Sequence, residues 1–92
     1  MAKLTPDQIN ERLATVPEWK KIDSMISRTY KFKDFLASME FVNRVAPLAE
    51  QANHHPDIDI RWNKVTLALT THSEGALTEK DFDLAQKCDR LS

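Results

Sequence analysis

The chain reads Ile58-Asp-Ile-Arg-Trp-Asn-Lys-Val-Thr-Leu-Ala-Leu69 in its second half, and the spacing of the apolar residues here indicates the fold class. Large apolar side chains stand at every second position over 58–62 and again over 65–69. This period of two is typical of half-buried β-strands, whose side chains point alternately to the two faces of a sheet. Asn63 and Lys64 lie between the runs and predict a tight turn, so the two strands pair as an antiparallel hairpin.

A second hairpin is expected earlier in the chain. Residues 19–22 and 25–32 predict two strands on either side of Asp23 and Ser24. In the longer strand, mostly apolar residues again alternate with polar ones. Two hairpins of this kind favour a single antiparallel sheet of four strands.

Helices are expected before, between and after the hairpins. Thr5 followed by Pro6 predicts the start of the first helix, which Pro17 ends. Thr78 predicts the start of the last helix, with Asp81 in the place that Glu or Gln usually takes in a capping box. The last helix is expected to bury an apolar face made of Leu77, Phe82, Ala85, Cys88 and Leu91.

The middle helix is predicted from Lys33 as far as Asn53, because the apolar spacing changes there to three or four residues. Pro47 lies inside this helix, where a proline removes a hydrogen bond at a cost of about 3 kcal/mol. We expect a kink at 43–47, and two separate helices are the alternative. The expected apolar side consists of Phe35, Met39, Val42, Ala46, Ala49 and Asn53.

These elements predict a single domain over residues 1–92 with an α+β fold in the order α-β-β-α-β-β-α. We expect two layers, in which three helices pack on one face of a four-stranded antiparallel sheet. The other face of the sheet would be bare or would help to join subunits.

The composition argues against several classes of protein. Hydrophobic residues make up 41% and charged residues 29%, as in a soluble globular protein. The net charge of -1 argues against a general nucleic-acid binder. No apolar run approaches the roughly 20 residues that span a bilayer, and the N-terminal segment lacks the apolar core of a secretory signal. The single cysteine, Cys88, fits a reducing compartment and is expected to pack in the core, so we expect a cytoplasmic protein.

Candidate functional residues gather in one window. All three histidines, His54, His55 and His72, fall between Glu50 and Asp81. Histidine exchanges protons near neutral pH, since its unperturbed pKa is about 6.5. Three histidines close to two carboxylates therefore indicate proton-transfer chemistry at the ends of a helix and a strand, although each residue alone could be an ordinary surface or capping residue.

A zinc site is the alternative that the same residues leave open. Glu50, His54 and His72 would supply three ligands. However, the adjacent His54 and His55 do not easily face one ion, and the chain has no HExxH motif or cysteine pair. We therefore expect no metal. With one glycine in the chain there is no phosphate-binding loop, so a nucleotide cofactor is not expected either.

The pattern Glu50-x3-His-His-Pro-x5-Trp62-x9-His72-x8-Asp81 resembles the signature of the pterin-4a-carbinolamine dehydratases. The resemblance covers about residues 4–91. Its further matching segments are Trp19, 30–35, 44–46, 63–65 and 67–72. Two departures are an alanine after Gly75, where many members have a second glycine, and Trp62 where Tyr is common.

The resemblance implies a lyase that removes water from a 4a-hydroxytetrahydropterin to give quinonoid dihydropterin. This reaction recycles the cofactor of aromatic amino-acid hydroxylases. The resemblance also implies the α+β fold, no metal or organic cofactor, and assembly through the sheet as a homodimer or homotetramer.

The reaction needs an acid that protonates the leaving hydroxyl and a base that removes a proton from a ring nitrogen. By the resemblance, His54, His55 and His72 line the pterin pocket. His54 and His72 would share the acid and base roles, and His55 would bind or position the substrate. Glu50 would orient His54, and Asp81 would do the same for His72.

Trp19 matches a family tryptophan near the pocket and would stack on the pterin ring or shield it. Two other functions stay open. The chain could be a dimerisation or regulatory module, because some relatives of the family bind a transcription factor, or it could act on another pterin.

Overall fold

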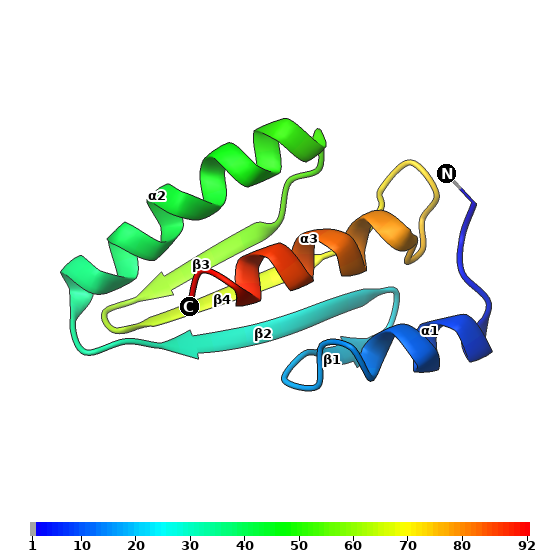
Figure 1. The fold of residues 1–92 in the computed structure, drawn as a ribbon, viewed down its shortest axis with the longest axis horizontal. Helices are drawn as coiled ribbons and strands as arrows, with labels where there is room; N and C mark the ends of the chain where they lie inside the picture. The colour runs from blue at the N-terminus through cyan, green and yellow to red at the C-terminus, as the bar shows by residue number, and fades with distance from the viewer. Residues whose placement is uncertain (1) are drawn as a thin grey trace.

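The computed structural model describes residues 2–92, so that Met1 lies outside it, and shows three helices beside one four-stranded antiparallel sheet (Figure 1). The elements are α1 (Pro6–Leu13), β1 (Lys20–Ile22), β2 (Met25–Lys31), α2 (Phe35–Ala52), β3 (Asp57–Arg61), β4 (Lys64–Leu69) and α3 (Glu79–Asp89). The strands are ordered β1-β2-β4-β3, so the two hairpins meet where β2 pairs with β4. The predicted α+β class and element order are confirmed. Within residues 2–92 no helix is long and apolar enough to cross a membrane.

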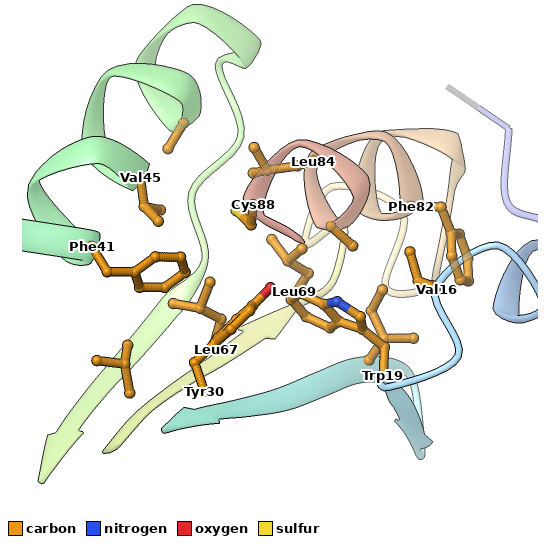
Figure 2. Packing of buried hydrophobic residues seen from close by; sticks show 14 of the residues in the cluster. Val16, Trp19, Tyr30, Phe41, Val45, Leu67, Leu69, Phe82, Leu84 and Cys88 are labelled. Atoms are coloured by element: carbon orange, nitrogen blue, oxygen red, sulfur yellow. The ribbon is translucent and has the colours of Figure 1, made fainter. Parts of the chain in front are cut away.

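Burial follows the predicted alternation along the two central strands. Val65, Leu67 and Leu69 of β4 are buried, and so are Ile26 and Tyr30 of β2, which pair with the ends of the same row. The helices cover this face of the sheet. Figure 2 shows side chains of α2 and α3 meeting those of β4 in one core. The opposite face is mostly polar, because most of the residues between the buried ones are polar, and it also carries Ile22, Met25 and Ala68.

Helix α2 turns a different side to the sheet from the one predicted. Its buried residues are Ser38, Phe41, Val45 and Ala49, whereas Phe35 of the predicted stripe is 51% exposed. The prediction is confirmed for Ala49 and, in part, for Val42, which packs against the core. It was wrong for Phe35 and Ala46, because this helix carries apolar residues on more than one side and spacing alone does not select the side that meets the sheet. The helix runs through Pro47 without interruption, so the alternative of two helices is also wrong.

The turn of the second hairpin lies one residue earlier than predicted. Arg61 pairs with Lys64, so Trp62 and Asn63 form the turn, and Trp62 adopts a positive φ of 50°. The reason is a contact distant in sequence. The Asn63 side chain donates to the carbonyl of Phe32 at 3.1 Å, and its own carbonyl accepts from the Phe32 amide at 2.7 Å. These bonds hold Asn63 against the end of β2.

A half-buried polar network lies at the end of α3. Oδ1 of Asp89 accepts hydrogen bonds from Trp19 Nε1 at 2.9 Å and from Arg28 Nη1 at 2.9 Å, and a third from the hydroxyl of Tyr30. Burial, with the bond to Asp89, raises the pKa of Tyr30 well above its usual range. The network therefore ties α3 to β2 and to the segment before β1.

Cys88 is buried in the core, as predicted. Burial raises the pKa of its thiol to about 12. The thiol therefore stays protonated at neutral pH and packs as a small apolar group.

We expect Asp89→Asn to lower the free energy of unfolding by about 2 kcal/mol, because it leaves buried donors poorly paired and removes the charge that faces Arg28. Urea unfolding followed by tryptophan fluorescence measures the change. Asp83→Asn, at an exposed position of the same helix, is the matched control. Equal stability of the Asp89 variant and the wild type would contradict this account of the network.

A second prediction concerns the contact between α1 and α3. Arg12 Nε lies 2.8 and 3.0 Å from the two carboxylate oxygens of Glu79, and this pairing holds the pKa of Glu79 below its usual range. A lowered folded pKa means that the pair stabilises the fold above the ordinary Glu pKa of about 4.3, and that this stabilisation is lost as the pH falls through the lowered value. Glu79→Gln should therefore reduce Tm at pH 7 and reduce the loss of Tm on acidification. Thermal unfolding from pH 7 to pH 3 tests this, with Glu40→Gln, on the exposed side of α2, as the control. Parallel Tm curves for Glu79→Gln and the wild type would exclude the effect.

Candidate active site

Three segments come together at one end of the molecule: the end of α2, the loop after β4 and the start of α3 (Figure 1). Helix α2 stops at Asn53, whose backbone is left-handed with φ 49° and ψ 45°. The amide of His54 then bonds back to the carbonyl of Ala49 at 3.1 Å, and that of Asn53 to Glu50 at 3.1 Å. This is the pattern of a Schellman motif, in which the chain leaves the helix axis sharply.

His54 is placed by this turn against a buried carboxylate. Its Nε2 lies 2.5 Å from Oδ1 of Asp81, and the two residues are 8% and 0% exposed. The second oxygen of Asp81 accepts from the hydroxyl of Thr71 at 3.0 Å and from the amide of Thr78 at 2.9 Å. The Thr78 contact belongs to the predicted capping box of α3, which is confirmed. A fully buried carboxylate needs such partners, and here both oxygens have them.

His72 is the first residue of a four-residue turn after β4. The turn is closed by pairing between Thr71 and Ala76, and Gly75 within it adopts a positive φ of 61°. The side chain of His72 is exposed. It therefore differs from His54, which is buried and hydrogen-bonded to Asp81.

The three histidines are brought together around one hollow in the surface. The residues that line it are Asn53, His54, His55, Thr71, His72, Ser73 and Lys80. The hollow thus carries three groups that exchange protons, and one of them, His54, is buried against an acid. Such an arrangement suits acid and base catalysis on a small polar molecule.

The acids pair with different histidines from those expected. Asp81 was expected to orient His72 but contacts His54, whereas Glu50 lies 3.5 Å from Nε2 of His55 with both side chains exposed. The physical cause is Asn53. Since its left-handed backbone ends the helix, His54 no longer shares a helix face with Glu50 and turns toward α3 instead.

Trp19 lies elsewhere in the molecule. Its ring is 3% exposed within the core, and its indole nitrogen donates to Asp89, two turns along α3 from Asp81 (Figure 2). Of the residues described, neither Trp19 nor Glu50 lines the hollow. In this chain Trp19 serves the packing of the core.

Several residues of the hollow were not predicted, and one of them had a signal in the sequence. Thr71 continues the buried row of β4 at 65, 67 and 69, so it is a polar residue in the place of an apolar one. Lys80 and Ser73 gave no such signal, because an exposed helix lysine or a turn serine is ordinary. Within residues 2–92 no group of three or more potential metal-ligating side chains is arranged to hold a metal ion.

Comparison with known proteins places these features in a family. The model of the pterin 4 alpha carbinolamine dehydratase family matches residues 2–91. A protein of Acidobacterium capsulatum named for this dehydratase is 57% identical, with 99% of each chain covered. One of a Picosynechococcus species, named likewise, is 52% identical, with 97% of each chain covered.

Solved structures agree with this placement. The crystal structure of a transcriptional coactivator/pterin dehydratase from Brucella melitensis has a TM-score of 0.94 at 37% identity and covers 98% of both chains. A pterin dehydratase-like RuBisCO assembly factor of the alpha-carboxysome, at 22% identity and a TM-score of 0.66, shares the fold. The chain therefore belongs to the pterin-4a-carbinolamine dehydratase family.

Proposed function

We propose that the protein is a 4a-hydroxytetrahydrobiopterin dehydratase, a hydro-lyase that converts 4a-hydroxytetrahydropterin to quinonoid dihydropterin and water by histidine acid/base catalysis. The observation that carries the proposal is the hollow where His54, His55 and His72 meet, with His54 held on a buried carboxylate. Membership of the family supplies the substrate class.

The chemistry matches the groups in the hollow. The C4a–O bond breaks as the hydroxyl receives a proton and leaves as water. The electron pair of a ring N–H bond forms the new C=N bond as its proton goes to a base. Since one proton is given and one is taken, two histidines in opposite protonation states complete the reaction, and neither a redox step nor a further reagent enters the balance.

His54 and His72 share the acid and base roles in this proposal. They come from different elements and line the same hollow, so both can contact a substrate that binds there. His55, exposed at the rim, binds or positions the substrate, and Glu50 supports it from 3.5 Å. Asp81 orients His54.

We also propose that the enzyme is cytoplasmic, serves the recycling of the cofactor of aromatic amino-acid hydroxylases, and forms a homodimer or homotetramer. Support for self-association comes from exposed apolar residues near the end of the sheet where β3 turns into β4. Phe35 is 51%, Leu36 67% and Trp62 66% exposed. Such a group of apolar side chains on a small protein is typical of a contact between copies.

A regulatory role is the second candidate, because the related Brucella protein is described as a transcriptional coactivator as well as a pterin dehydratase. A protein that only bound a partner would not need acid and base groups around a hollow. Measurement of turnover separates the two functions.

The first test follows the ultraviolet absorbance of enzymatically generated 4a-hydroxytetrahydropterin with and without the protein, before and after EDTA treatment. We expect faster decay of the substrate in both protein samples, since the reaction is assigned to histidines. No acceleration would favour the regulatory module, and acceleration lost with EDTA would favour the zinc alternative.

Substitution tests the residue roles. We expect His54→Ala and His72→Ala each to lower kcat by about 10²- to 10⁴-fold, the usual contribution of a general acid or base. Asp83→Ala, at an exposed position of α3 that does not line the hollow, should keep the wild-type rate. Circular dichroism verifies that each variant is folded. Wild-type rates in both histidine variants would refute the assignment.

A further inference from the structure

A line of buried polar groups runs from the start of α3 to His54. The hydroxyls of Thr78 and Thr71 lie 2.7 Å apart, Thr71 Oγ1 lies 3.0 Å from Oδ2 of Asp81, and Oδ1 of Asp81 lies 2.5 Å from His54 Nε2. The exposed fractions of these four residues lie between 0% and 8%. Water therefore has little access to the line, and its hydrogens must be shared among its own members.

The direction of each hydrogen bond follows from the supply of donors. Thr78 Oγ1 accepts from the amide of Lys80 at 3.3 Å, so its own hydrogen is free for Thr71. Thr71 has one hydroxyl hydrogen and two neighbours, and the carboxylate of Asp81 is the stronger acceptor. The line therefore runs from Thr78 to Thr71 to Asp81, with all donors pointing toward the carboxylate.

This direction decides which nitrogen of His54 carries the hydrogen. An ionised carboxylate only accepts hydrogen bonds, and Oδ2 already has two donors, the Thr71 hydroxyl and the Thr78 amide. Oδ1 then accepts from Nε2 of His54, so in the neutral ring Nδ1 is the nitrogen with the free electron pair. Within residues 2–92 the hydrogen bond of the His54 ring is the one between Nε2 and Asp81, and His54 lines the hollow.

We propose that Thr71 is a positioning residue of the active site: its hydroxyl fixes the carboxylate of Asp81 and thereby holds neutral His54 as the tautomer whose Nδ1 accepts a proton. In the dehydration proposed above, on which the kinetic part of this inference rests, Nδ1 of His54 takes the proton from the ring nitrogen. The acid that protonates the leaving hydroxyl is then His72.

The backbone of Thr71 adds to this role. Its amide and carbonyl pair with Ala76, and its carbonyl also accepts from Glu74 at 3.0 Å. These bonds close the turn that begins with His72. One residue thus holds the turn that carries His72 with its backbone and the acid that orients His54 with its side chain.

The test compares Thr71→Val, which keeps the branched shape and removes the hydroxyl, with Thr71→Ser, which keeps the hydroxyl. The ring ¹⁵N shifts of His54 in the substrate-free protein report its tautomer, at a pH where the ring is neutral. We expect hydrogen on Nε2 in the wild type and in Thr71→Ser. In Thr71→Val the carboxylate of Asp81 keeps only the Thr78 amide on Oδ2, so it is held less firmly and should release His54. A second tautomer with hydrogen on Nδ1 is then populated.

The kinetic constants kcat and KM show whether Thr71 positions other residues or contacts the substrate itself. We expect kcat of Thr71→Val to fall about 10-fold, since the loss of one donor to a buried charge is of that order, while KM stays within about 2-fold. Thr71→Ser should restore most of kcat. A change in KM with an unchanged kcat would overturn the proposal, and so would an unchanged tautomer in folded Thr71→Val.

If Thr71→Val does not fold, the ring ¹⁵N spectrum of the wild-type protein still tests the inference. Hydrogen on Nδ1 of neutral His54 in the wild-type spectrum would overturn the proposal without any variant. Because the spectrum needs no substrate, its result is independent of the proposed reaction. A protein with the expected tautomer and no dehydratase activity would refute the proposed function and leave the hydrogen-bonded line in place.

Discussion

The carboxylate of Asp81 is the group on which the structure of the candidate site depends. An ionised carboxylate with no exposed surface is tolerated only if it is paired or hydrogen-bonded. Its hydrogen-bond partners come from three segments. They are Thr78 at the N-cap of α3, Thr71 after β4 and His54 after α2. Removal of any one of them would leave a buried charge underpaired. The hydrogen bonds of Asp81 therefore hold these three segments together and fix His54 at the edge of the hollow.

Much of the fold could be predicted because the signals that define it are local. The alternation over 65–69 and the capping box at Thr78 are both read within a few residues, and both are present in the structure. The expected burial of the preceding run is not, because Ile58 is 41% and Trp62 66% exposed. The side of α2 and the turn at Trp62 could not be predicted in the same way. The first is selected by the sheet that the helix meets, and the second by bonds between Asn63 and Phe32, 31 residues apart.

In the candidate site, too, features with a local cause could be predicted from the sequence, and features that depend on the tertiary structure could not. The window that holds the three histidines could be recognised from residue type and spacing, whereas the pairing of acid with histidine could not. That pairing depends on one left-handed residue, Asn53, which turns His54 away from Glu50 and toward Asp81. Asn adopts this conformation more readily than most residues, but a sequence does not show where a helix will use it.

Two of the carboxylates of α3, those of Asp81 and Asp89, hold this helix in place beside the candidate site. Asp81 and Asp89 lie eight residues apart on this helix, which is roughly 12 Å along its axis. The first is hydrogen-bonded at the hollow, and the second is bonded to Trp19, Arg28 and Tyr30 in the core. A helix held at both ends gives His54 a fixed support, whereas His55 and His72 lie on exposed segments. Because His54 is buried against Asp81 and the other two histidines are exposed, the hollow combines one histidine that is held in place with two that face solvent.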